Sequence, residues 1–508
     1  MYLIVIHKTK DVLPIVLLIM KPIPREWENM PEKITVDWSN LATAEIPIEG
    51  LHPARRIQET AGKLVLTLAR GMFMLMVVAI PWRYRFNLLQ RPRPPIYGDF
   101  TDFLLFAADI LMIAMLLFWL AGLALQRRGI QAGPMVISLP LAGLTLAGIA
   151  SIPFSVDPAL SAYQALRLIL LGGLYLYVVN EIHSWKTIVL PAALMILSQG
   201  WVAILQALGQ HSIGLQALGE YALNPQWSGV SIVLSGGVRI LRAYGLADHP
   251  NILGGCLAMA LLALGIWSAG QPASPWRPIT MGILGIGSLA LLYTFSRSAW
   301  IALVGGGLLA AGLFFKTGQR DLGRQWLLTG LGILAILVPF IFNLAPALGI
   351  RLGFRGSFTQ VATEEQSLGE RKLLDETANQ LFENQPLTGV GLGAFVIAQQ
   401  AAFPNFPVDY QPAHLVFLDA AAETGIFGAL FYASLLLAPW LALWLGRKHL
   451  HFSVELVGAS ALLLAISLIG LFDYYTWLLV PGRLWCWLAW GLWAASYRSA
   501  SFGRRDYA

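Results

Sequence analysis

Three arginines and one histidine, on four separate segments, could together bind a diphosphate and remove a proton. The segments "RAYGLADHPNILGG" (242–255), "TFSRSAW" (294–300), "ERKLLDETANQLFENQPLTGVGLGAF" (370–395) and "AHLVFLDAAAETGIFG" (413–428) carry Arg242, Arg297, Arg371 and His414. Guanidinium groups bind phosphate oxygens bidentately and stay charged. A histidine that titrates near neutral pH can take a proton from an attacking hydroxyl. The combination predicts displacement of a pyrophosphate leaving group, with arginines in the place of the divalent cation that other transferases use.

The tetrapeptide "DHPN" has an ordinary interpretation as the start of a helix. Asp248 would be the N-cap, and Pro250 would lie in the first turn, where its missing N–H costs nothing. Taken alone, capping is the favoured interpretation. Because Arg242 lies only seven residues before His249, we also predict that His249 and Asn251 line the donor site. His414 is then the predicted base, in preference to His249.

The remaining candidates have ordinary interpretations of their own. Arg297 could extend to lipid headgroups, and Arg371 could pair with Asp375 one helical turn later. His414 could be an interfacial histidine with satisfied hydrogen bonds. Glu423 lies nine residues after His414, on the opposite face of a shared helix, so it is not a predicted catalytic partner.

Other motifs are less informative. "TGVGLGAF" (388–395) predicts a flexible turn, since no strand precedes it and no GK[ST] follows, as a nucleotide-binding loop would require. Metal-binding motifs and a pair of carboxylates for glycoside hydrolysis are not evident. The cysteines, Cys256 and Cys486, lie in apolar runs, which predicts neither a disulfide nor a metal site.

The composition indicates which elements must position these residues. The 508-residue chain is 57% hydrophobic and 12% charged, about half the charged fraction of a soluble protein. Its 18 Trp and 15 Tyr fit the aromatic belts of a membrane interface. We therefore predict an all-α integral membrane protein with about twelve transmembrane helices. The predicted spans are 62–81, 101–124, 134–153, 161–180, 187–208, 250–269, 278–295, 298–315, 326–345, 426–446, 455–472 and 477–497.

Basic residues in the short loops predict the sidedness. If residues 1–61 form a cytoplasmic or interfacial segment, every predicted inner loop is basic, both termini are inside, and residues 62–508 form one membrane domain. The large external loops are then 209–249 and 346–425, the second lying between spans nine and ten. A surface helix is expected to end near Asn384 in the second loop. All the candidate site residues fall on the external side.

One predicted outer loop does not fit this rule. The segment "WRYRFNLLQRPRPP" (82–95) contains four arginines. Either the first span is misread, or these arginines meet lipid phosphates or an anionic substrate outside the membrane. The other loops and the tail favour keeping the topology.

The motifs resemble the O-antigen ligase and O-antigen polymerase family, membrane glycosyltransferases that use polyprenyl-pyrophosphate-linked glycans. "SVDPALSAYQALR" (155–167) and the four segments quoted above follow one another in the family's order, and the similarity runs from about residue 100 to the C-terminus. The resemblance implies a GT-C-like fold. It also implies that His414 activates the acceptor hydroxyl and that Arg242, Arg297 and Arg371 bind the donor. The family often has Asn after the loop histidine, where this chain has Leu415.

The implied reaction is inverting, metal-independent and free of any cofactor or nucleotide. A glycan would pass from a polyprenyl-pyrophosphate donor to an acceptor hydroxyl on the external, periplasmic face of the inner, cytoplasmic membrane, in cell-surface polysaccharide biosynthesis. The expected partners are this donor, membrane lipids and an acceptor, and no nucleic acid. The acceptor distinguishes a ligase from the alternatives, a polymerase or a protein O-glycosyltransferase. From another class, a transporter or flippase of anionic lipid-linked glycans would use the same arginines, but should place ionisable groups near the bilayer midplane.

Overall fold

The computed structural model describes residues 3–5, 16–18, 53–271, 275–353 and 358–502. Two compact units divide the chain, Met1–Arg56 and Ile57–Ala508. In the first unit, strand β1 (Leu3–Val5) pairs antiparallel with β2 (Val16–Leu18). The rest of the predicted N-terminal segment up to residue 52 lies outside the described residues.

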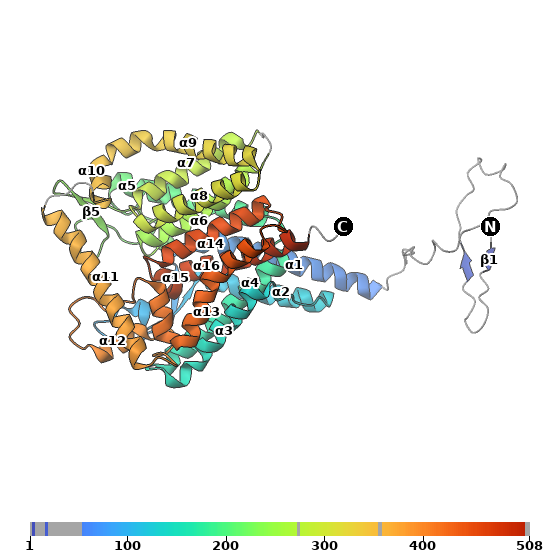
Figure 1. Ribbon diagram of the computed structural model, residues 1–508, viewed down its shortest axis with the longest axis horizontal. Helices are drawn as coiled ribbons and strands as arrows, with labels where there is room; N and C mark the ends of the chain where they lie inside the picture. The colour runs from blue at the N-terminus through green and yellow to red at the C-terminus, as the bar shows by residue number, and fades with distance from the viewer. Residues whose placement is uncertain (1–2, 6–15, 19–52, 272–274, 354–357, 503–508) are drawn as a thin grey trace. The chain divides into compact units, whose positions relative to one another are not determined.

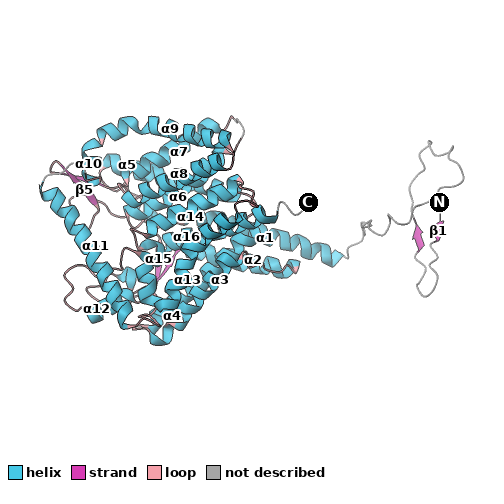
Figure 2. Ribbon diagram, viewed as in Figure 1, coloured by secondary structure: helices cyan, strands magenta, loops and turns pink. Residues whose placement is uncertain are grey.

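The second unit is mostly helical, as Figure 2 shows. Its helices are α1 (Pro53–Ala79), α2 (Ala107–Gln126), α3 (Met135–Ala150), α4 (Pro158–Glu181), α5 (Lys186–Gly209), α6 (Pro250–Ala269), α7 (Arg277–Tyr293), α8 (Arg297–Lys316), α9 (Arg320–Asn343), α10 (Ala345–Arg351), α11 (Phe358–Asn384), α12 (Phe395–Ala402), α13 (Val416–Gly446), α14 (Val454–Gly470), α15 (Tyr475–Leu478) and α16 (Val480–Phe502). Each of the twelve predicted spans overlaps one of the longer helices, with bounds that differ by up to ten residues.

Nine of the described helices are long and apolar enough to cross a membrane. The helices α7 and α14 are also apolar but only 17 residues long. The chain is therefore a multi-pass helical membrane protein. At its N-terminal end, α1 begins at Pro53, ahead of the predicted start at residue 62, so part of the expected loop is helical.

Helix α6 is the central element of the bundle. Its 20 residues are apolar except for Asn251 and Ser268, and begin with Pro250 at the first helical position, where the missing N–H has no partner to lose. Of this span 89% is buried, and the helix packs against α5, α7, α8 and α14 (Figure 1). A segment with so few polar groups can be enclosed on all sides in this way.

Short elements gather at one end of the bundle, at the left of Figure 1. They include the hairpins β3 (Arg85–Leu89)/β4 (Phe103–Phe106) and β5 (Ile232–Ser235)/β6 (Val238–Leu241), together with α10, α11, α12 and α15. Most of these elements come from the two predicted external loops and from the shorter connections on the same predicted side. Strand β4 falls inside the predicted span 101–124, so the start of that span was wrong: residues 103–106 pair with β3, and the helix begins only at Ala107. As predicted, α11 ends at Asn384.

Three of the four arginines of residues 82–95 are held in ion pairs. Arg83 and Arg85 each contact Asp248 at 2.8 Å, and Arg85 also contacts Asp99 at 2.7 Å. Arg91 contacts Asp157 at 2.6 Å. Neither explanation offered for this basic loop included these pairs, in which acidic residues distant in sequence offset the three charges.

The glycine-rich segment 388–395 is a packed turn. Gly389, Gly391 and Gly393 all have positive φ angles, which favour glycine. A Cβ on Gly389 would approach the Glu423 backbone to 2.4 Å. Val390 and Gly391 donate backbone hydrogen bonds to the carbonyls of Ala422 and Glu423. The turn thus fits against α13, just before its non-helical break at Gly425 (φ 66°).

Candidate functional site

The turn between α7 and α8 presents two carbonyl groups to two arginines. Phe295 has φ 49°, a left-handed conformation that is uncommon for a bulky residue. It is fully buried in an apolar cluster. The carbonyl of Thr294 accepts a hydrogen bond from Arg242 Nε at 2.7 Å, and that of Phe295 accepts one from Arg351 Nε at 3.1 Å. This strained turn therefore orients guanidinium groups from two distant parts of the chain.

Arg242 begins a chain of buried hydrogen bonds. Its Nη2 donates to Asn251 Oδ1 at 2.5 Å, and Asn251 Nδ2 donates to Asp473 Oδ1 at 2.9 Å. Ser298 Oγ donates to the other oxygen of Asp473 at 2.5 Å. Burial, and next the charge of Arg351, lower the pKa of Arg242 to about 9, so the side chain remains a cation at neutral pH. A cation so poorly solvated interacts strongly with any anion that reaches it.

His249 caps α6 and is not poised as a base. The N-cap is His249, and not Asp248 as predicted, because Asp248 is engaged by Arg83 and Arg85. The ring Nδ1 accepts from the backbone N–H of Asn251 at 3.1 Å. In the neutral ring the proton is therefore on Nε2, 2.9 Å from Ser231 Oγ. Burial, followed by the charge of Arg242, lowers the pKa of His249 to about 3, so the ring stays neutral.

Arg371 acts on the surroundings of His414. Burial first, and then the charge of Arg371, lower the pKa of His414 to about 3. The same guanidinium also contributes to the pKa shifts of His249 and Asp473. The His414 ring packs edge-on against Tyr474, with ring centroids 5.4 Å apart. Its Nδ1 is buried without a hydrogen-bond partner among the described residues, so the imidazole is a neutral group beside a cationic one.

Two carboxyl groups that the sequence did not single out support the turn carrying His414. Asp419 Oδ1 accepts from the backbone N–H of Ala413 at 2.8 Å. The carboxyl group of Asp375 lies against the backbone N–H groups of His414 and Leu415, and burial raises its pKa. Asp375 lies one helical turn after Arg371 in the sequence. This spacing was the only sequence signal that connected Asp375 with a site residue. The turn is thus fixed from both α11 and α13.

The structure brings the six predicted site residues to one end of the bundle. Arg297 opens α8 one residue after the N-cap, and its charge contributes to the pKa shift of Arg242. Arg351 belongs to the same cluster although no motif marks it. Glu423 lies apart from these groups and accepts a hydrogen bond from Trp477 Nε1 at 2.8 Å.

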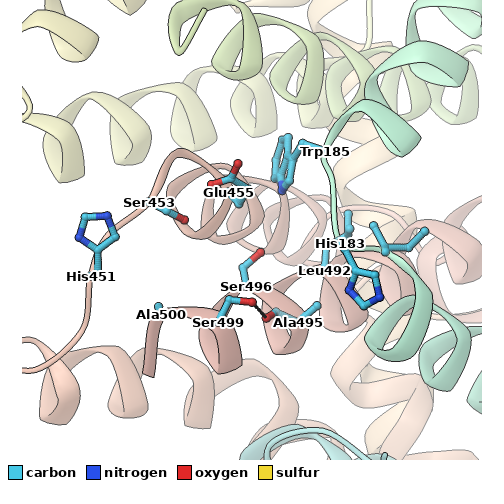
Figure 3. Close-up of a pocket in the computed structure, with 11 residues that line it drawn as sticks. His183, Trp185, His451, Ser453, Glu455, Leu492, Ala495, Ser496, Ser499 and Ala500 are labelled. Atoms are coloured by element: carbon cyan, nitrogen blue, oxygen red, sulfur yellow. Dashed lines mark hydrogen bonds between the residues drawn. The ribbon is translucent and has the colours of Figure 1, made fainter. Parts of the chain in front are cut away.

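A separate cavity lies where α4 meets α5, beside the start of α14 and the end of α16. Its lining includes His183, Trp185, His451, Glu455 and Ser496, whose side chains are drawn in Figure 3. None of the predicted site residues lines it. The arginine cluster and this cavity are therefore different places in the fold.

The fold and the site define a class of protein: a multi-pass helical membrane protein with buried arginines and neutral histidines gathered at one end of its bundle. Residues 282–433 match the family model described as O-antigen ligase, so the chain carries an O-antigen ligase domain. The matched range includes Arg297, Arg371 and His414, and ends within α13. No curated protein matches the chain.

Proposed function

We propose that the protein is a membrane glycosyltransferase of the O-antigen ligase type, using a polyprenyl-pyrophosphate-linked glycan as donor. The observation that carries this proposal is the position of Arg371, whose charge acts on His414, His249 and Asp473 together. A cation that binds the leaving group therefore lies beside the one buried imidazole with an unpartnered nitrogen in the described chain. The predicted sidedness places this site on the external face.

In the proposed reaction, His414 removes the proton from the acceptor hydroxyl. The freed oxygen attacks the anomeric carbon, a new glycosidic bond forms, and the bond between that carbon and the diphosphate oxygen breaks with inversion. Arg242, Arg297 and Arg371 bind the diphosphate as its negative charge grows. His249 and Asn251 contribute by helping to hold the Arg242 guanidinium in position.

The low pKa of His414 has a consequence for this reaction. An imidazole with a pKa of about 3 is neutral but a weak base. A diphosphate bound to Arg371 would offset the guanidinium charge, which after burial is the second cause of this low pKa, and would raise the pKa of His414. Donor binding would thus make the imidazole a stronger base.

The intramembrane charges favour the transferase over a transporter. Arg167 Nη2 lies 2.6 Å from Asp109 Oδ2, and Arg483 Nη1 donates to Gln164 at 2.7 Å. These contacts tie α2, α4 and α16 together. Charged side chains that bond neighbouring helices in this way stabilise the helix bundle. In a transporter, such side chains would instead line a cavity along the transport path. Among the transferases, a ligase, a polymerase and a protein O-glycosyltransferase would all use the same site with different acceptors.

The test uses the purified full-length protein, a short polyprenyl-pyrophosphate glycan and a panel of acceptors, with and without chelator. Chelator-resistant transfer that is lost in His414→Ala and Arg242→Lys supports the proposal. Loss of transfer on chelation would contradict the role given to the arginines. Donor uptake into vesicles without a covalent product would favour the transporter.

A further inference from the structure

A fourth arginine, Arg351, is held beside Arg242 by the same two-residue turn. The carbonyl groups of Thr294 and Phe295 are consecutive, and each accepts a hydrogen bond from the Nε of one of these arginines. We propose that Arg351 is a further donor-binding residue, which together with Arg242 forms a two-guanidinium site for both phosphates of a diphosphate. This inference rests on the proposed function and extends it to a residue outside the predicted motifs.

Apolar packing holds Arg351 in this position. It is the last residue of α10, and Ala347 and Leu348 of that helix are buried in one cluster with Phe295 and Val233. The contacts join α10 to the strained turn and to strand β5. Because Arg351 follows Leu348 by less than one helical turn, its guanidinium is delivered to the carbonyl of Phe295 by the packing of α10.

The arginines of this cluster lie close enough for their charges to interact. The charge of Arg351 lowers the pKa of both Arg242 and His249, so these groups are close enough to repel. Arg297 adds to the shift of Arg242, and Arg371 to that of His249. The charges of Arg371 and Arg242 also act on Asp473, whose two oxygens are already bonded to Asn251 and Ser298. Gathering like charges in a buried place costs free energy that a bound polyanion recovers.

Two oriented guanidinium groups suit a diphosphate better than a single phosphate. Each guanidinium presents a planar fork that can bind two oxygens of one phosphate group. Anchoring through Nε fixes the plane of that fork before the ligand arrives, so less conformational entropy is lost on binding. A monophosphate could engage only part of this arrangement. The pair should therefore discriminate between the two ligands.

The experiment measures binding of inorganic pyrophosphate and of inorganic phosphate to the full-length protein in nanodiscs by calorimetry. The variants are Arg351→Gln, Arg351→Lys and, as a matched control, Arg324→Gln on an exposed part of α9. We expect Arg351→Gln to raise the Kd for pyrophosphate about 10- to 100-fold, as loss of a charge-assisted contact does. Its effect on phosphate should be smaller. Arg351→Lys keeps the charge and fold but loses the planar fork, and should show a partial loss.

The outcomes separate this inference from the proposed function. If Arg351→Gln and Arg351→Lys bind pyrophosphate as the wild type does, or if both ligands weaken equally, the two-guanidinium site is overturned. If Arg351→Gln weakens pyrophosphate binding selectively while glycan transfer is absent from the wild type, the inference stands and the proposed function fails. Thermal unfolding without ligand identifies a variant that has lost its fold. If Arg351→Gln is unfolded, pyrophosphate binding by Arg351→Lys decides whether Arg351 contributes to the site.

Discussion

Asn251 joins Arg242 to Asp473. Its side-chain oxygen accepts from the guanidinium at 2.5 Å, and its side-chain nitrogen donates to the carboxylate at 2.9 Å. The amide therefore satisfies a cation and an anion at once without neutralising either, which leaves Arg242 its charge for a ligand. An acid or a base at position 251 could not do both.

Replacing Asn251 by Ala should lower both stability and donor affinity. The substitution leaves a buried guanidinium N–H and a buried carboxylate oxygen without a partner, at a cost of about 1–3 kcal/mol. The free energy of unfolding and the KM for the donor would be measured together. Asn224→Ala is the control, since its side chain accepts a hydrogen bond from the nearby backbone N–H of Gln226 on an exposed part of the chain. Unchanged KM in Asn251→Ala would argue against a donor site at Arg242.

His414→Ala should reduce glycan transfer about 100- to 10,000-fold, the range expected for loss of a general base. Pyrophosphate binding should be retained, because the arginines that bind it are unaltered. The control is His211→Ala, an exposed histidine whose ring contacts the carbonyl of Ser212. Transfer at the wild-type rate in His414→Ala would remove this residue from the reaction.

Arg371→Gln should move the acidic limb of the pH profile toward higher pH. After burial, the charge of Arg371 is the cause that lowers the pKa of His414 to about 3. Removing that charge raises this pKa, so the base becomes protonated, and inactive, at a higher pH than in the wild type. The profile to record is kcat/KM for the donor, which reports on the free enzyme.

Lys372→Gln is a close control for this experiment, because Lys372 is the next residue of α11 and its side chain is 80% exposed. It removes the same charge without facing His414. An acidic limb that stays in place in Arg371→Gln, or that moves equally in both variants, would refute the coupling between Arg371 and His414.

Asp248→Ala should destabilise the protein by about 1–3 kcal/mol, because it leaves two arginines of the β3 region without their shared partner. The side chains of Arg83, Arg85 and Asp248 are partly exposed, at 24%, 20% and 18%. The loss of stability should therefore be smaller than for a fully buried ion pair. Chemical denaturation of the purified protein measures it. Glu376→Ala breaks the exposed pair with Lys372 and should cost under about 1 kcal/mol. Equal effects would mean that Asp248 has no special structural role.

The family resemblance and the helical membrane class were accessible from the sequence because both depend on local features. Apolar length sets which segments can enter a bilayer, and a short motif keeps its residue types whatever surrounds it. The twelve predicted ranges each overlap a helix.

Only the tertiary structure decided which charged side chains are paired within the protein and which remain for a ligand. Arg83 and Arg85 looked as available as Arg242, yet they are paired with Asp248 across more than 160 residues of sequence. The same contacts made His249, and not Asp248, the cap of α6. Arg351 joined the site without a motif, Asp375 and Asp419 joined it from within motifs that did not indicate their role, and Asn251 meets Asp473 at a separation of 222 residues. Hydrophobic length is a property of one segment, whereas ion pairing and burial depend on which segments the fold brings into contact.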